Sequence, residues 1–127
     1  MATYKEIKGV TVQTLDEDPV AAGASWSSGG ALNQARMTLA GAGIQTAALM
    51  AGGQHPPGIV GLVESYNGTS YSEVADITAR RLAAASGTST AGLVFGGSPS
   101  STQGTAVTES WNGSGWTEVN DLNNDGL

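Results

Sequence analysis

Through most of the chain, apolar and polar residues alternate in short blocks that end at glycine, proline or an Asn-Gly pair. Blocks bounded by turn-forming residues are typical of strands in antiparallel sheets. Gly43 and Gly87 permit the positive φ of a tight turn, and Asn67-Gly68 and Asn112-Gly113 are strong hairpin signals. The pattern predicts two groups of four strands, at residues 36–42, 44–51, 59–66 and 70–76 and at residues 80–86, 88–95, 104–111 and 115–121.

The two groups of strands are copies of one another. Residues 64–77 return as residues 109–122 at an offset of 45, and residues 39–53 return as residues 83–97 at an offset of 44. A fixed period of this kind predicts a repeat architecture. The chain then divides into an N-terminal arm, a partial repeat or linker, a first repeat, a second repeat and a C-terminal tail, at residues 1–25, 26–35, 36–79, 80–122 and 123–127.

One four-stranded unit that is apolar on both faces cannot bury its own surface, so it has to stack on copies of itself. Stacking around an axis gives a β-propeller, whose repeats have about this length. Two blades cannot close a ring of about 4–8 blades, so we expect a homo-oligomer. Three chains give six blades and are preferred, while two or four chains give four or eight. A piece of a longer array, or a chain that never assembles, is the alternative.

The partial repeat admits two interpretations. Residues 26–36 align with residues 71–80 with one residue to spare, so they resemble the outer strand of a blade. The second repeat already has its own outer strand at residues 115–121. Either the partial copy is a linker, which its Ser-Ser-Gly-Gly run favours, or it completes a neighbouring blade and displaces the C-terminal strand.

Composition excludes several classes of function. The 127 residues carry a net charge of −6, which opposes nucleic-acid binding, and they include 19 glycines, no cysteine and the single histidine His55. We therefore expect no catalytic residues, no metal site and no cofactor. The sequence has no long apolar run, so no membrane association is expected either.

Charged residues recur with the repeat. The pairs are Glu64 and Glu109, Glu73 and Glu118, Asp76 and Asp121, and Arg36 and Arg80. Paired carboxylates can act in glycoside hydrolysis, but an active site is normally used once whereas these recur in each unit. We interpret them as structural, with both arginines either lining a channel or pairing with the carboxylates.

Recurring aromatic residues and two variable loops are the candidate contact sites. Buried anchoring between blades is the favoured role of the aromatics, and stacking on sugars is the alternative. The Asn-Gly turns match the N-glycosylation pattern, but hairpin geometry explains them. The aromatics are Tyr66, Tyr71, Trp111 and Trp116, and the candidate ligand residues are Gln54 and His55 in one loop and Ser98 and Ser100 in the other.

The first 25 residues do not repeat and are richer in charge. Residues 7–15 alternate like a strand, which suggests an arm that docks on a partner by strand addition. An N-terminal strand lying on its own propeller, or a frayed terminus, is the alternative. The candidate docking residues are Ile7, Val10, Val12 and Leu15.

Two double glycines and the spacing of the aromatics carry a family resemblance. Gly52-Gly53 and Gly96-Gly97 each end a run of small and apolar residues, and a loop and two aromatics five residues apart follow. This arrangement resembles the kelch motif of β-propellers. The copper-radical oxidases of that group need a cysteine and several ligands that are missing here, so their activity is not carried over.

A narrower resemblance concerns the residue-by-residue sequence of the repeats. Residues 39–49, residues 110–122 and the leader at residues 2–9 are similar to kelch-like structural proteins of marine bacteriophages, especially cyanophages. Those arrays usually have many more repeats. The resemblance implies a non-enzymatic structural or decoration protein, made in the host cytoplasm, that contacts other virion proteins in the phage particle. The alternative is a carbohydrate-binding propeller that attaches to a host-surface glycan.

Overall fold

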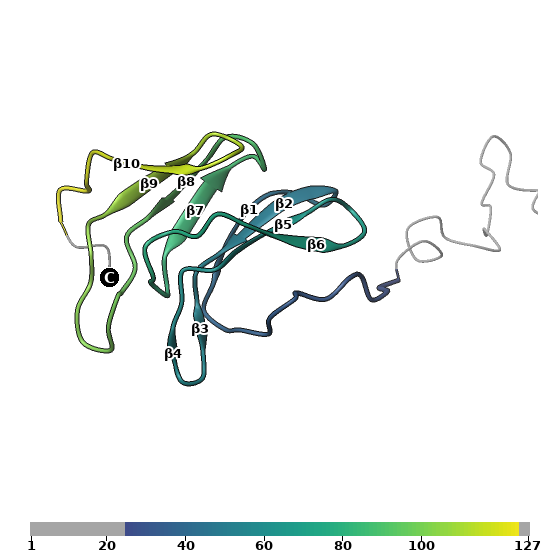
Figure 1. Ribbon diagram of the computed structural model, residues 1–127, viewed down its shortest axis with the longest axis horizontal. Helices are drawn as coiled ribbons and strands as arrows, with labels where there is room; N and C mark the ends of the chain where they lie inside the picture. Colours follow the sequence, from purple (N-terminus) through teal and green to yellow (C-terminus); the bar gives the residue numbers. More distant parts are fainter. Residues whose placement is uncertain (1–24, 125–127) are drawn as a thin grey trace, which may run out of the picture.

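A computed structural model describes residues 25–124. These residues form ten β-strands and no helix. Eight strands make two four-stranded antiparallel sheets, and the other two make a short hairpin (Figure 1). The prediction of an all-β chain built from four-stranded antiparallel units is thereby confirmed, and within the described residues the two sheets do not close a ring.

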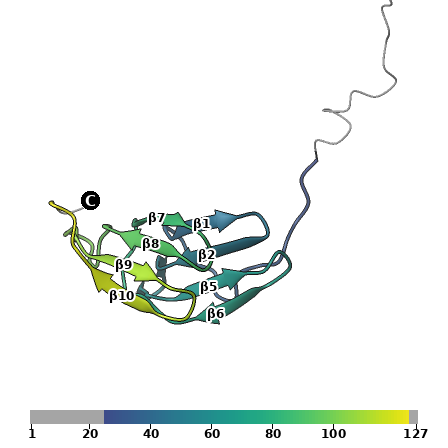
Figure 2. The ribbon, with the colours of Figure 1, turned by 90° about the horizontal axis from the view of Figure 1, so that it is seen from above.

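Each sheet follows the order of its strands along the chain. The first sheet contains β1 (Ala40–Ile44), β2 (Ala47–Ala51), β5 (Val63–Tyr66) and β6 (Tyr71–Val74). The second sheet contains β7 (Ala84–Gly87), β8 (Gly92–Phe95), β9 (Thr108–Trp111) and β10 (Trp116–Val119). Figure 2 shows the order from β1 and β7 at one edge to β6 and β10 at the other.

The tight turns form as their sequences predict. Gly43 and Gly87 have φ angles of 113° and 112°, in the region that favours glycine. In the β5–β6 turn, Asn67 Oδ1 accepts the backbone N–H groups of Thr69 and Ser70, both at 2.9 Å. Asn112 Oδ1 does the same in the β9–β10 turn. These bonds hold each hairpin in register.

Alternation along the strands gives each sheet two faces. We call "front" the face that carries the cross-strand glutamates, Glu64 opposite Glu73 in the first sheet and Glu109 opposite Glu118 in the second. The opposite face is the "back". The back of the first sheet packs on the front of the second sheet, and Figure 2 shows the two sheets adjoining.

The hydrophobic core lies between the two sheets. Burying apolar side chains there provides about 25 cal/mol for each Å² removed from water. The core residues are Leu49, Ala51, Val63 and Ile77 from the first repeat and Val94 and Trp111 from the second, with Val74, Ala83, Ala85 and Trp116 packed against them.

Strands β1 and β7 come closest to each other. The backbone N–H of Leu82, just before β7, donates to the carbonyl of Thr38, just before β1, at 2.9 Å. Thr38 and Leu82 have positive φ angles of 57° and 58°. These kinks interrupt the extended backbone, which explains why β1 and β7 begin about four residues later than the sequence pattern predicts.

Two further differences from the predicted elements have local causes. The third strand begins at Val63 rather than residue 59, because the backbone of Gly61 lies against Ile77 and accepts its N–H. In place of the predicted loop at residues 54–58, β3 (Gln54–His55) and β4 (Gly58–Ile59) pair as a hairpin that extends one residue beyond it. Pro56 and Pro57 at the tip of this hairpin are typical of loops, so the sequence pattern did not predict the two short strands.

Candidate functional site

A buried ion pair recurs at the start of each sheet. Arg36 Nη1 lies 2.5 Å from Glu64 Oε2 in the first sheet, and Arg80 Nη2 lies 3.0 Å from Glu109 Oε2 in the second. All four side chains are at most 8% exposed. Of the two roles considered for the arginines, pairing with the recurring carboxylates is the one observed.

Each glutamate also binds the chain segment that enters its sheet. Glu64 Oε1 accepts the backbone N–H of Asn33 at 2.6 Å. Glu109 accepts the N–H of Thr78 at 3.1 Å and 3.2 Å through its two carboxylate oxygens. We call each set of arginine, glutamate and backbone N–H a clamp. Thr78 lies in the linker between the sheets, so the second clamp joins the two repeats.

The two clamps differ in how fully the arginine is satisfied. Arg36 also donates to the carbonyls of Gly52 and Met50, at 2.9 Å and 3.1 Å. Arg80 donates to the carbonyl of Val94 at 3.1 Å, but its Nε and Nη1 are buried with no partner among residues 25–124. Burial lowers the pKa of the Arg80 guanidinium, and the Glu109 carboxylate opposes that change. Glu109 therefore supplies the counter-charge that the buried guanidinium of Arg80 needs.

The double glycines lie where β2 and β8 end. The φ angles are 67° and 109° at Gly52 and Gly53 and 69° and 92° at Gly96 and Gly97. The N–H of Gly53 donates to the carbonyl of Arg80 at 2.8 Å, across the junction of the two repeats. A Cβ atom on Gly53 would lie 2.7 Å from the carbonyl oxygen of Met37. The glycines therefore permit close backbone approach at this junction.

The recurring aromatics form two equivalent pairs on the sheet fronts. The ring centroids are 4.6 Å apart for Tyr66 and Tyr71 and 5.0 Å apart for Trp111 and Trp116. Trp111 is buried between the sheets, and Trp116 Nε1 donates to the carbonyl of Ala75 at 2.9 Å. Both tyrosines are half-buried, because no sheet covers the front of the first sheet within the described residues.

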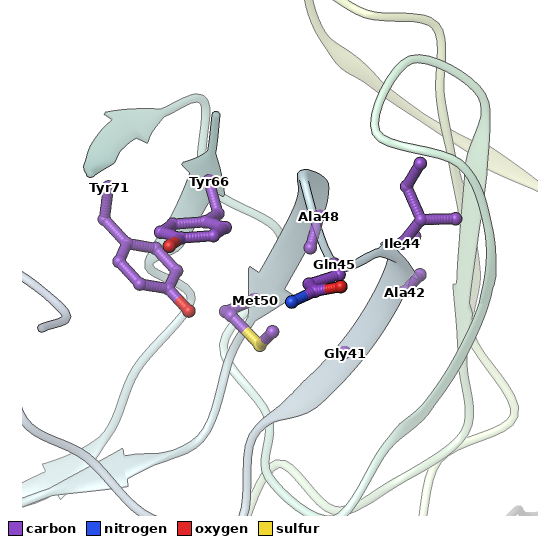
Figure 3. A pocket seen from close by; sticks show the side chains of 9 residues that line it. Gly41, Ala42, Ile44, Gln45, Ala48, Met50, Tyr66 and Tyr71 are labelled. Atoms are coloured by element: carbon purple, nitrogen blue, oxygen red, sulfur yellow. The ribbon is translucent and has the colours of Figure 1, made fainter. Parts of the chain in front are cut away.

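An open cavity of about 350 Å³ lies on the front of the first sheet. Figure 3 shows the rings of Tyr66 and Tyr71 at one side, Met50 beside them and Gln45 and Ile44 at the other side. The remaining lining residues are Gly41, Ala42, Gly43 and Ala48. A second cavity, of about 360 Å³, borders the back of the second sheet at Ser86, Leu93 and Ser110.

The candidate ligand loops meet at one arginine that the sequence pattern did not single out. Arg81 Nη1 donates to Gln54 Oε1 at 2.5 Å, and the Arg81 backbone exchanges hydrogen bonds with Ser98 at 2.8 Å and 3.0 Å. The Ser98 hydroxyl lies within hydrogen-bond distance of the carbonyls of Ser100 and Gln103 and can donate to either of them. His55 is half-buried in β3. Gln54 and Ser98 are thus engaged in contacts within the chain.

Three residues that make contacts in the structure were not predicted from the sequence. Asn33 holds the partial repeat to the first sheet, and Thr78 and Arg81 take part in contacts between the two repeats. Asn33 and Thr78 bind the glutamates through backbone N–H groups, which side-chain identity does not reveal. The docking residues Ile7, Val10, Val12 and Leu15 fall outside the described residues. Within residues 25–124 there is no cluster of His, Asp and Glu suited to a metal ion.

In comparisons with known proteins, no family model matches the chain and no curated protein sequence matches it. Within residues 25–124, no helix has the length and apolar character required to cross a bilayer.

Proposed function

We propose that this chain is a non-enzymatic structural or decoration protein of a phage particle. Kelch-like blades from several chains assemble into a propeller, and the arm at residues 1–25 docks on another virion protein. The observation that carries the structural role is the repeated clamp. The virion setting rests on the resemblance of the repeats to structural proteins of marine phages.

The clamps support a structural role because they use the recurring charges inside the scaffold. Glu64 and Glu109 are almost fully buried, and each forms an ion pair with an arginine and accepts a backbone N–H. A carboxylate that acts as a general acid or base needs access to a substrate proton. Here the oxygens bind the entering chain segment instead, once in each repeat.

The placement of the two sheets supports a propeller built from several chains. β1 and β7, the first strand of each repeat, lie next to each other, as the innermost strands of adjoining blades would. Each repeat contributes one four-stranded sheet, and the sheets pack face to face. Two such units require further copies to complete a ring.

The mass of the full chain in solution tests this proposal. Light scattering behind a sizing column should give a closed multiple of 12.7 kDa, with three chains as the expected number. A folded monomer at every concentration would contradict the shared propeller. For the arm, a chain lacking residues 1–25 should fail to enter particles while it still assembles with the same number of chains. Normal incorporation of the shortened chain would contradict arm docking.

Carbohydrate binding is the second candidate, and the cavity beside Tyr66 and Tyr71 is the observation that favours it. Two half-buried rings and the Gln45 amide offer stacking and hydrogen bonding to a sugar. A glycan array should then give hits that Tyr71→Ala removes and that Tyr4→Ala, in the arm, retains. An array without hits above background would eliminate this candidate.

A further inference from the structure

We propose that the front of the first sheet binds the back of the second sheet of another copy, and that residues 29–33 cover this front until the second copy displaces them. The inference rests on the proposed function, because it names the partner surfaces through which the chains would assemble. Within residues 25–124 the two sheets pack on each other through one interface, and that interface shows how two copies would pack.

The interface within the chain is a template for the interface between chains. It joins the back of the first repeat to the front of the second. Because the repeats are copies, the two faces left over are the equivalents of the two faces that are buried. Stacking one copy on the next therefore repeats an existing contact in a head-to-tail arrangement.

The exposed back of the second sheet has the character of a buried face. Leu93, Val119 and Leu122 are 40%, 40% and 37% exposed. By the offsets of 44 and 45, they correspond to Leu49, Val74 and Ile77, which all pack in the core of the described structure. The back of the second sheet has no charged side chain on its strands, so docking it removes no charge from water.

A leucine that packs against a small residue of the facing sheet would fix how the two sheets align. In the observed interface, Leu49 lies next to Gly92, where an added Cβ atom would be 3.7 Å from the leucine Cδ1. The equivalent residues on the free faces are Leu93 and Ala48. Ala48 lines the cavity of about 350 Å³ that Figure 3 shows. Leu93 of a second copy would fill that cavity, as Leu49 packs against the second sheet.

Residues 29–33 occupy the position that a preceding repeat would take. Asn33 binds Glu64 as Thr78 binds Glu109. A Cβ on Gly29 would lie 3.3 Å from the Tyr66 hydroxyl, and one on Gly30 would lie 2.5 Å from the carbonyl oxygen of Thr69. The corresponding part of the linker also lies against the second sheet, since Trp116 Nε1 donates to the carbonyl of Ala75. This stretch therefore stands in for the end of a missing outer strand.

Docking brings two segments to one position. Leu122 of the incoming copy is held by its own N–H, which donates to the carbonyl of Ala106 at 2.9 Å, as Ile77 is held by Gly61. When the second sheet of the incoming copy docks, its Leu122 takes the position that Leu32 occupies on the first sheet of the other copy, because Leu122, Ile77 and Leu32 are equivalent by the offset of 45. The strand before Leu122 is fully paired with β9, whereas residues 26–32 form no strand and contain a Ser-Ser-Gly-Gly run. Residues 29–33 are therefore the segment that moves.

The two docking faces are tested in the full chain with one variant on each face: Leu93 on the back of the second sheet and Ala48 on the front of the first. Leu93→Lys and Ala48→Phe should each raise the protein concentration needed for assembly about tenfold or more, measured by light scattering. Thr102→Lys adds the same charge to an exposed loop position of the second repeat and should leave assembly unchanged. Circular dichroism verifies that each variant is folded. Assembly that neither Leu93→Lys nor Ala48→Phe weakens would overturn the proposed pairing.

The cover is tested at Gly30. Gly30→Val adds a side chain that the covering position has no room for, so the segment should leave the sheet front and assembly should occur at lower concentration. Gly58→Val is the matched control, because a Cβ there meets nothing within 4 Å. Unchanged or weaker assembly of Gly30→Val would overturn the covering role of residues 29–33.

The outcomes separate this inference from the proposed function. Closed multimers that resist both face variants would leave the shared propeller standing and overturn the pairing. Open-ended fibres that Leu93→Lys dissolves would support the pairing and overturn the closed ring. A folded monomer whose mass no variant changes would overturn both, and would assign the free faces to a different partner.

Discussion

Arg80 and Glu109 form a buried ion pair, with 3.0 Å between Arg80 Nη2 and Glu109 Oε2, at the entrance to the second sheet. Glu109 belongs to β9, and its carboxylate also holds the N–H of Thr78, which lies in the linker from the first sheet. The pair therefore controls where the chain passes from one sheet to the next. Its equivalent, Arg36 with Glu64, lies at the entrance to the first sheet, with 2.5 Å between Arg36 Nη1 and Glu64 Oε2.

Glu109→Gln should destabilise the protein by about 3–5 kcal/mol, because it leaves the guanidinium of Arg80 buried without its counter-charge. Glu64→Gln should cost less, since Arg36 keeps its bonds to the carbonyls of Gly52 and Met50. Urea unfolding at one fixed protein concentration measures both, because assembly would otherwise add to the apparent stability.

Glu118→Gln is the control for the clamp. Glu118 lies opposite Glu109 across the β9–β10 pair but is exposed, so its neutralisation should change stability by about 0.5 kcal/mol or less. Equal losses for Glu109→Gln and Glu118→Gln would mean that the pair does not stabilise the entrance to the second sheet.

The sequence predicted the repeat and its strands, because both are encoded in side-chain patterns. The period, the Asn-Gly turns and the glycines with positive φ all place a recognisable residue at a fixed position. It did not predict how the repeats are joined. The contacts of Asn33 and Thr78 use backbone N–H groups, and the kinks at Thr38 and Leu82 occupy positions where glycine would have been expected.

Gly87→Ala should cost about 1–3 kcal/mol, because the residue has a φ angle of 112° and an added Cβ would collide with the carbonyl of Ala91. Gly115→Ala is the matched control in the same sheet, where a Cβ meets nothing within 4 Å. Thermal unfolding followed by circular dichroism compares the two. A smaller loss at Gly87 than at Gly115 would show that the β7–β8 turn has a different backbone.

The candidate site was predicted in part, for a related reason. Recurrence drew attention to Arg36, Arg80, Glu64 and Glu109, which form two ion pairs in the structure. Recurrence could not distinguish buried aromatics from half-buried ones. Tyr66 and Trp111 occupy equivalent positions, yet only Trp111 has a second sheet packed on it.

Asn112→Ala should destabilise the second sheet by about 1–2 kcal/mol. The Asn112 side chain accepts the N–H groups of Ser114 and Gly115 at 2.8 Å and 2.9 Å, and alanine leaves both without this acceptor. Asn120→Ala removes an exposed amide just after β10 and should have little effect. Urea unfolding measures the stability of both variants, and an equal effect of the two changes would contradict the role of Asn112 in the turn.

The tryptophans allow a test of the interface between the sheets. Trp111 is 4% exposed in the core, and its Nε1 donates to the carbonyl of Ser89 at 2.9 Å, whereas Trp26 is fully exposed. Trp111→Ala should cost about 3–5 kcal/mol, through lost burial and the cavity left behind. Trp26→Ala should change stability by about 0.5 kcal/mol or less.

Fluorescence provides an independent measurement on the same two variants. Removing Trp26 should shift the emission of the folded chain to shorter wavelength, because the remaining signal comes from Trp111 and the half-buried Trp116. Removing Trp111 should shift it to longer wavelength. If Trp111→Ala leaves both the emission and the unfolding midpoint unchanged, the two sheets do not pack through this residue, and the interface that serves as the template for self-association is wrong.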